Sequence, residues 1–110
     1  MLDPYFSATK VAWLLGPGGV AAGPDVAVGT IDSWLLWKLT GEHLTDTTNA
    51  SRTSLFDIRA LAWSTELCEL FGVPLHTLPE IRRSDAGYGL HRGIPVTAVL
   101  ADSHAALYAH

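Results

Sequence analysis

The chain has 110 residues, 48% of them hydrophobic and only 16% charged, and we expect so apolar a small chain to be part of a larger protein that covers some of this surface. The formal net charge of -4 and the scattered basic residues exclude a nucleic-acid-binding surface, and no apolar run is long enough for a membrane span. The single cysteine, Cys68, excludes an internal disulfide and is expected to be a buried apolar side chain, and with no signal peptide in view we expect a cytoplasmic protein.

The first half of the chain predicts two helices. Ser7 can cap a helix over residues 7–15, which the glycine and proline cluster after it ends. Residues 26–28 are a short strand candidate. Residues 31–40 predict a second helix that ends at Gly41, and because this helix is apolar nearly all round, we expect it to be buried on several sides.

The second half alternates between polar and apolar stretches. Residues 44–58 are rich in Thr, Asn, Asp and Ser and show no period, which predicts irregular structure. Ser64 predicts the cap of a helix over residues 65–71. The continuous apolar run over residues 95–101 predicts a strand buried on both faces, as in a parallel sheet, and a helical pattern begins near Ala105.

Asp102 is the strongest candidate for chemistry, because it stands between the expected strand and the expected helix. Ligands of open α/β sheets bind at the carboxyl ends of the strands, and the positive end of the following helix favours an anion there. A carboxylate in this place can accept a proton from a substrate hydroxyl or hold a metal ion, although an Asp before a helix can also be only a cap. Tyr5 can offer its hydroxyl to a ligand or be an ordinary half-buried tyrosine.

Four segments stand out along the chain: DPYFSATK at residues 3–10, GTIDSWL at residues 29–35, TDTTNASRT at residues 45–53 and LADSHAAL at residues 100–107. In this order they resemble segments of the glycerol kinases of the FGGY family of carbohydrate kinases, and the similarity extends over nearly the whole chain. Any one of them alone would be weak evidence, but the four together are specific.

The resemblance implies an α/β fold, namely part of one actin-like, ribonuclease H-like lobe of a two-lobed sugar kinase. Residues 1–110 would be the second, incomplete part of the N-terminal kinase domain, and the rest of the kinase chain would be its partner. The implied reaction transfers the γ-phosphate of ATP, with Mg²⁺, to glycerol, giving glycerol 3-phosphate, and most ATP-binding residues would lie outside this chain. Asp102 would be the catalytic base, and Tyr5, Asp102 and Ser103 would contact the substrate.

Two departures from the family pattern leave alternatives open. Ser103 stands where the family has a glutamine that contacts glycerol, so another polyol or a ketopentose is a second candidate substrate. The short GLHRG stretch at residues 89–93 replaces a longer loop that binds fructose 1,6-bisphosphate in many bacterial members, so that regulatory site is expected to be absent. A non-enzymatic α/β interaction module is a third interpretation, and a homo-oligomer is a further candidate assembly.

Overall fold

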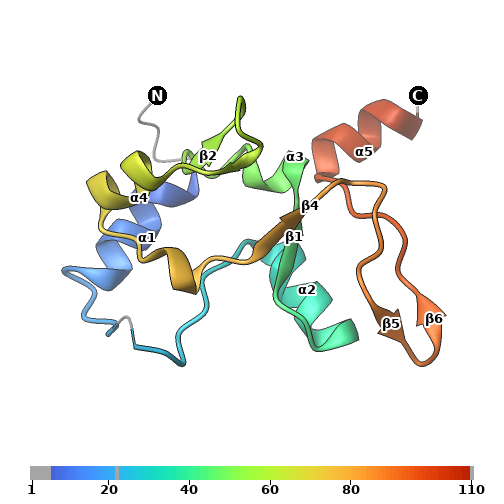
Figure 1. The fold of residues 1–110 in the computed structure, drawn as a ribbon, viewed down its shortest axis with the longest axis horizontal. Helices are drawn as coiled ribbons and strands as arrows, with labels where there is room; N and C mark the ends of the chain where they lie inside the picture. Colours follow the sequence, from blue (N-terminus) through green and yellow to red (C-terminus); the bar gives the residue numbers. More distant parts are fainter. Residues whose placement is uncertain (1–5, 22, 110) are drawn as a thin grey trace. The chain divides into compact units, whose positions relative to one another are not determined.

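The computed structural model describes residues 6–21 and 23–109, and it combines helices with short two-stranded sheets (Figure 1). The backbone divides into two compact units, one formed by Met1–Val28 and Ala50–Leu78 and the other by Gly29–Asn49 and Pro79–His110. The predicted α/β class is confirmed. The elements in chain order are α1 (Ser7–Leu15), α2 (Ile31–Thr40), β1 (Leu44–Asp46), α3 (Thr47–Ala50), β2 (Phe56–Asp57), β3 (Ala62–Trp63), α4 (Thr65–Phe71), the 3-10 helix η1 (Leu75–Thr77), β4 (Glu80–Arg82), β5 (Leu90–His91), β6 (Ile94–Pro95) and α5 (Asp102–Ala109).

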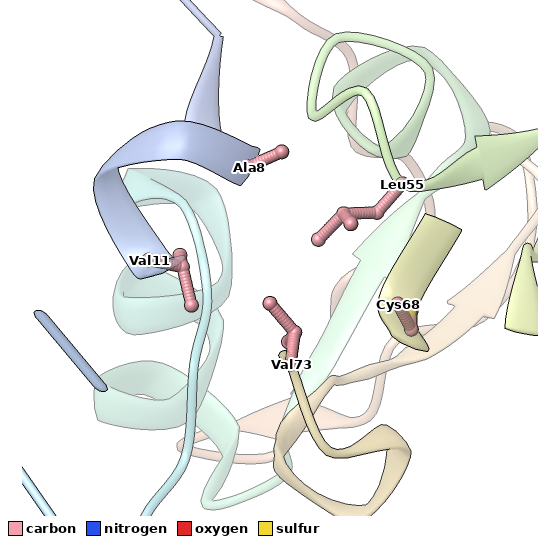
Figure 2. Close-up of a cluster of buried hydrophobic side chains, with 5 residues drawn as sticks. All are labelled: Ala8, Val11, Leu55, Cys68 and Val73. Carbon is pink, nitrogen blue, oxygen red and sulfur yellow. The ribbon is translucent and has the colours of Figure 1, made fainter. Parts of the chain in front are cut away.

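The first unit packs α1 and α4 around a small apolar core. Figure 2 shows its five buried side chains, which come from both helices and from the segments that follow α3 and α4: Ala8, Val11, Leu55, Cys68 and Val73. Each of them is at most 8% exposed. Burial also raises the pKa of the Cys68 thiol, so the prediction that this cysteine is a buried apolar side chain is confirmed.

Three of the predicted helices have the expected bounds, and two of their ends have the expected chemistry. The Ser64 hydroxyl accepts a hydrogen bond of 3.2 Å from the Leu67 amide and so caps α4. Helix α2 ends at Gly41, whose φ of 80° lies in the left-handed region that glycine adopts at low cost. The predicted cap of α1 is wrong, because Ser7 is the first residue of the helix and the extended Phe6 before it makes no side-chain capping bond.

The second unit is built on a parallel strand pair, of which one strand lies in the region 44–58 that the sequence predicted to be irregular. Strands β1 and β4 run side by side in a register that aligns Asp46 with Arg82 (Figure 1). Leu36 of α2, Leu44 of β1 and Tyr88 form the buried core of this unit. The prediction of irregular structure over residues 44–58 is therefore wrong for β1, α3 and β2, since elements of two to four residues are too short to show a period.

The apolar run over residues 95–101 is not the buried parallel strand that the sequence predicted. Its first residue belongs to β6, which pairs antiparallel with β5 across a two-residue turn, and Arg92 and Gly93 of this turn both have positive φ. Residues 96–101 belong to no strand, and Leu100 among them is exposed. A strand of a parallel sheet needs a neighbouring strand to pair with, and the described residues supply none to residues 96–101.

Two further predictions about the first half of the chain are also wrong. Helix α2 is not buried on several sides, because only Ser33 and Leu36 are buried whereas Trp34 and Trp37 are more than half exposed. The apolar pattern shows which side chains could be buried, but not whether other parts of the protein cover them. Within the described chain only one side of α2 is buried. Residues 26–28 belong to no strand, although the Val28 amide donates a 2.7 Å hydrogen bond to the Thr77 carbonyl.

The hydroxyl of Tyr88 should contribute measurably to stability, because it is fully buried and donates a 2.6 Å hydrogen bond to the Arg83 carbonyl. We expect Tyr88→Phe to lower the free energy of unfolding by roughly 1–2 kcal/mol, since the carbonyl loses its buried donor. Tyr108 is 90% exposed, so Tyr108→Phe is the matched control and should change stability by less than about 0.5 kcal/mol. Equal effects of the two substitutions in denaturant titrations would contradict this interpretation.

Candidate functional site

The candidate base and its neighbour lie at the start of α5. Asp102 is the first residue of this helix and Ser103 the second, and both side chains are exposed. The Ser103 amide donates a 2.7 Å hydrogen bond to Asp102 Oδ1, which holds the carboxylate near the positive end of the helix. The preceding residue, Ala101, is only 4% exposed, so the chain passes from buried to accessible at Asp102. Tyr5 lies outside the described residues.

A second carboxylate, at the end of β1, is completely buried. Asp46 is 0% exposed and accepts hydrogen bonds from five donors. Oδ2 accepts from the Thr48 amide at 3.2 Å, the Thr48 hydroxyl at 2.6 Å and the Ser84 hydroxyl at 2.6 Å. Oδ1 accepts from the Asn49 amide at 3.0 Å and from the Asn49 side-chain nitrogen at 2.7 Å. Two of these donors are amides in the first turn of α3, so Asp46 also caps that helix.

The hydrogen bonds keep Asp46 ionised. Burial alone raises the pKa of this carboxyl group, but the bonds from Ser84, Thr48 and Asn49 together lower it below its ordinary value of 3.8. The same negative charge acts on the buried Tyr88, whose pKa is raised first by burial and then by Asp46. At neutral pH the site therefore contains a buried aspartate anion and a protonated tyrosine.

The residues that bond Asp46 also hold the segment that leads into Asp102. The Thr48 hydroxyl accepts a 2.9 Å hydrogen bond from the Ala101 amide, and the Ser84 carbonyl accepts one of 2.9 Å from the Val99 amide. Figure 1 shows α3 following β1 directly, and the bond from Ala101 joins this region to the segment before α5, whereas the bond from Val99 joins the same segment to the residues after β4. The segment of residues 96–101 is thus held by hydrogen bonds from the amides of Val99 and Ala101 and not by pairing with a strand.

Sequence reasoning named the motif that contains Asp46 but missed the role of this residue. An Asp followed by Thr-Thr-Asn is a capping pattern, which could have predicted the bonds to Thr48 and Asn49. Nothing in the sequence indicates the bond to Ser84, which is 38 residues further along the chain.

The described residues provide no metal-ion site of their own. Among them, no three His, Cys, Asp or Glu side chains are grouped so that they could hold a metal ion. None of the helices in the same part of the chain is long and apolar enough to cross a membrane.

The chain has the fold of part of an α/β sugar-kinase lobe, as its similarity to two solved structures shows. The structure of Plasmodium falciparum glycerol kinase with ADP superposes with a TM-score of 0.85, with 34% identity over 94% of this chain and 23% of that one. The xylulose kinase of Lactobacillus acidophilus has the same fold, with a TM-score of 0.79 and 21% identity over 93% of this chain and 23% of that one.

The sequence comparison identifies the family. Residues 1–109 match the N-terminal domain of the FGGY family of carbohydrate kinases, and the chain belongs to this family. It is 51% identical to the glycerol kinase of Alcanivorax borkumensis and 49% identical to that of Thermus brockianus, in each case over 97% of this chain and 24% of the relative. The chain thus spans about a quarter of the length of these relatives.

The ionised Asp46 should make stability depend on acid pH. Because its folded-state pKa is lowered, the stabilisation is fully present above the ordinary value of 3.8 and is lost as the pH falls through the folded-state pKa. We expect Asp46→Asn to cost roughly 1.5–3 kcal/mol in unfolding free energy at pH 6, with a difference from wild type that shrinks below pH 4. Unfolding titrations at several pH values measure this.

The exposed Asp25 supplies the control for that titration. Asp25→Asn should change the free energy of unfolding by less than about 0.5 kcal/mol at every pH tested. A difference between wild type and Asp46→Asn that stays constant from pH 6 to the lowest measurable pH would contradict the ionised, hydrogen-bonded state of Asp46.

Proposed function

We propose that this chain is part of a glycerol kinase, in which it supplies the catalytic base and part of the glycerol site. The observation that carries the proposal is the identity of about half of all positions to curated glycerol kinases over nearly the whole chain, together with an accessible Asp102 at the start of α5. Residues 1–110 would form the second part of the N-terminal kinase domain. ATP would be the phosphate donor, and the rest of the polypeptide would supply most of its binding residues.

Asp102 has the surroundings that a general base for this reaction needs. Its carboxylate would accept the proton of a glycerol hydroxyl while that oxygen forms a bond to the γ-phosphorus, and the bond from this phosphorus to the β-γ bridging oxygen breaks to release ADP. Mg²⁺ bound with ATP would neutralise charge on the phosphates. Ser103 would contact the substrate beside Asp102, and Tyr5 would donate a hydrogen bond to a glycerol hydroxyl.

A second polyol or a ketopentose is the alternative substrate, and Ser103 is the observation that favours it. The resemblance places a glutamine at this position in glycerol kinases, and the shorter serine side chain reaches less far. A comparison of kcat/KM for glycerol, other polyols and ketopentoses would decide between them. Glycerol should be preferred, and a ketopentose preferred at least tenfold would replace glycerol in the proposal.

We further propose that the complete protein works in the cytoplasm. The support is the chemistry of the proposed reaction, which uses ATP as the phosphate donor. Self-association through the exposed tryptophans of α2 is a further proposal, since exposed apolar patches favour contacts between protein surfaces.

In the full-length protein, Asp102 should matter far more to the rate than Tyr5. We expect Asp102→Asn to lower kcat by about 10²- to 10⁴-fold with the fold intact, because a general base acts in the transition state. Tyr5→Phe removes one neutral hydrogen bond and should raise KM for glycerol by roughly tenfold or less. Steady-state kinetics with coupled ADP detection measures both.

Asp57→Asn is the matched control for the loss of charge. Asp57 accepts a 2.9 Å hydrogen bond from the Arg59 amide in a turn of the first unit, so its substitution should leave kcat unchanged. A near-normal kcat for Asp102→Asn would make Asp102 a helix cap and would remove the proposed mechanism.

A further inference from the structure

We propose that Asp46 is a positioning residue for Asp102 and acts through Thr48 and Ser84. The proposal rests on the proposed function, because it requires Asp102 to be the base. It goes beyond that function by assigning a role to a buried carboxylate that cannot reach a substrate. Asp46 is 0% exposed, and its two oxygens already accept five hydrogen bonds.

The direction of the hydrogen bonds through Thr48 is fixed by its two partners. The ionised Asp46 carboxylate can only accept, and the Ala101 amide can only donate. The Thr48 hydroxyl must therefore give its hydrogen to Asp46 at 2.6 Å and receive that of Ala101 at 2.9 Å. Because this hydroxyl cannot turn away without losing a charged acceptor, its lone pair stays directed at the residue before Asp102.

Ser84 provides a second, parallel connection. Its hydroxyl donates to the same Asp46 oxygen at 2.6 Å, and its carbonyl accepts the Val99 amide at 2.9 Å. Val99 and Ala101 are alternate residues, and the amides of both donate to residues that also bond Asp46. Two bonds of this kind fix both the position and the direction in which the backbone enters α5.

The hydrogen bond to Ala101 should affect catalysis, because Ala101 directly precedes Asp102. Ala101 is buried and anchored, whereas Asp102 and the rest of α5 are exposed in the described chain. The anchor at Ala101 is therefore the last fixed point before the base. A misplacement of about 1 Å in a catalytic group can cost roughly a hundredfold in rate, so the loss of this anchor should appear in kcat.

The test is a double-mutant cycle in the full-length kinase, with wild type, Thr48→Val, Asp102→Asn and the double variant. Valine keeps the shape of threonine but lacks the hydroxyl. We expect Thr48→Val to lower kcat by roughly 10- to 100-fold in the wild-type background and by less than about threefold in the Asp102→Asn background, because a residue that acts through the base has nothing left to position. KM for ATP should stay within about twofold, and Thr48→Ser should restore kcat.

Thr77→Val is the matched control for the loss of a buried hydroxyl. Thr77 is fully buried and donates a 2.7 Å hydrogen bond to the Pro74 carbonyl in the first unit. Its substitution removes the same group without touching the Asp46 connections, so kcat should not change. If Thr77→Val and Thr48→Val lower kcat alike, or if the loss from Thr48→Val is the same in both backgrounds, the role is only structural and the inference is overturned.

Two further results complete the test. Ser84→Ala is a milder variant, since Ser84 is only partly buried. It can replace Thr48→Val in the double-mutant cycle if Thr48→Val does not fold. We expect it to lower kcat by about 3- to 10-fold in the wild-type background and not in the Asp102→Asn background. If Asp102→Asn abolishes activity while Thr48→Val and Ser84→Ala keep full kcat, the inference fails and the proposed function stands. If Asp102→Asn itself keeps kcat, the proposed function fails.

Discussion

The second unit depends on one buried carboxylate and the five donors around it. An unpaired anion in a protein interior is very costly, so Asp46 tolerates full burial only while its donors stay in place. These donors come from the start of α3 and from Ser84, beyond the end of β4, and they give the group a lowered pKa despite its burial. The carboxylate therefore ties together segments that a three-residue strand pair alone would hold weakly.

Asp102 and Asp46 lie in opposite surroundings, which fit the different roles proposed for them. Asp102 is exposed at the positive end of a helix, where a carboxylate can meet a substrate hydroxyl. Asp46 is sealed off from solvent, and its hydrogen bonds pass through Thr48 and Ser84 to the backbone that leads into α5. Phosphoryl transfer relies chiefly on positioning and on electrostatic stabilisation, so an anchored approach to the base suits the proposed reaction.

Four motifs predicted the family and the α/β class, and local sequence features predicted most helix bounds, but the pairing of distant segments was not predicted. The bounds of α1, α2 and α4 follow from apolar spacing and from chemistry such as the Ser64 cap, which neighbouring residues determine. The pairing of β1 with β4 could not be predicted, because both strands are three residues long and lie more than thirty positions apart. The run over residues 95–101 was predicted as a buried strand from its composition, but pairing depends on neighbours that the described chain does not provide. A motif singles out Asp102, whose catalytic role stays a prediction, whereas the hydrogen bond between Asp46 and the distant Ser84 could not be predicted from the sequence.

Amide hydrogen exchange at Ala101 tests the central claim most directly, because that amide is the last anchored group before Asp102. We expect the Ala101 amide to be protected from exchange in the wild-type protein and its protection factor to fall at least tenfold in Thr48→Val. The Gly41 amide, which donates a 2.8 Å hydrogen bond to the Trp37 carbonyl at the end of α2, is the control and should keep its protection factor. Exchange at Ala101 as fast as at exposed amides in the wild type, or equal protection in the two proteins, would contradict it.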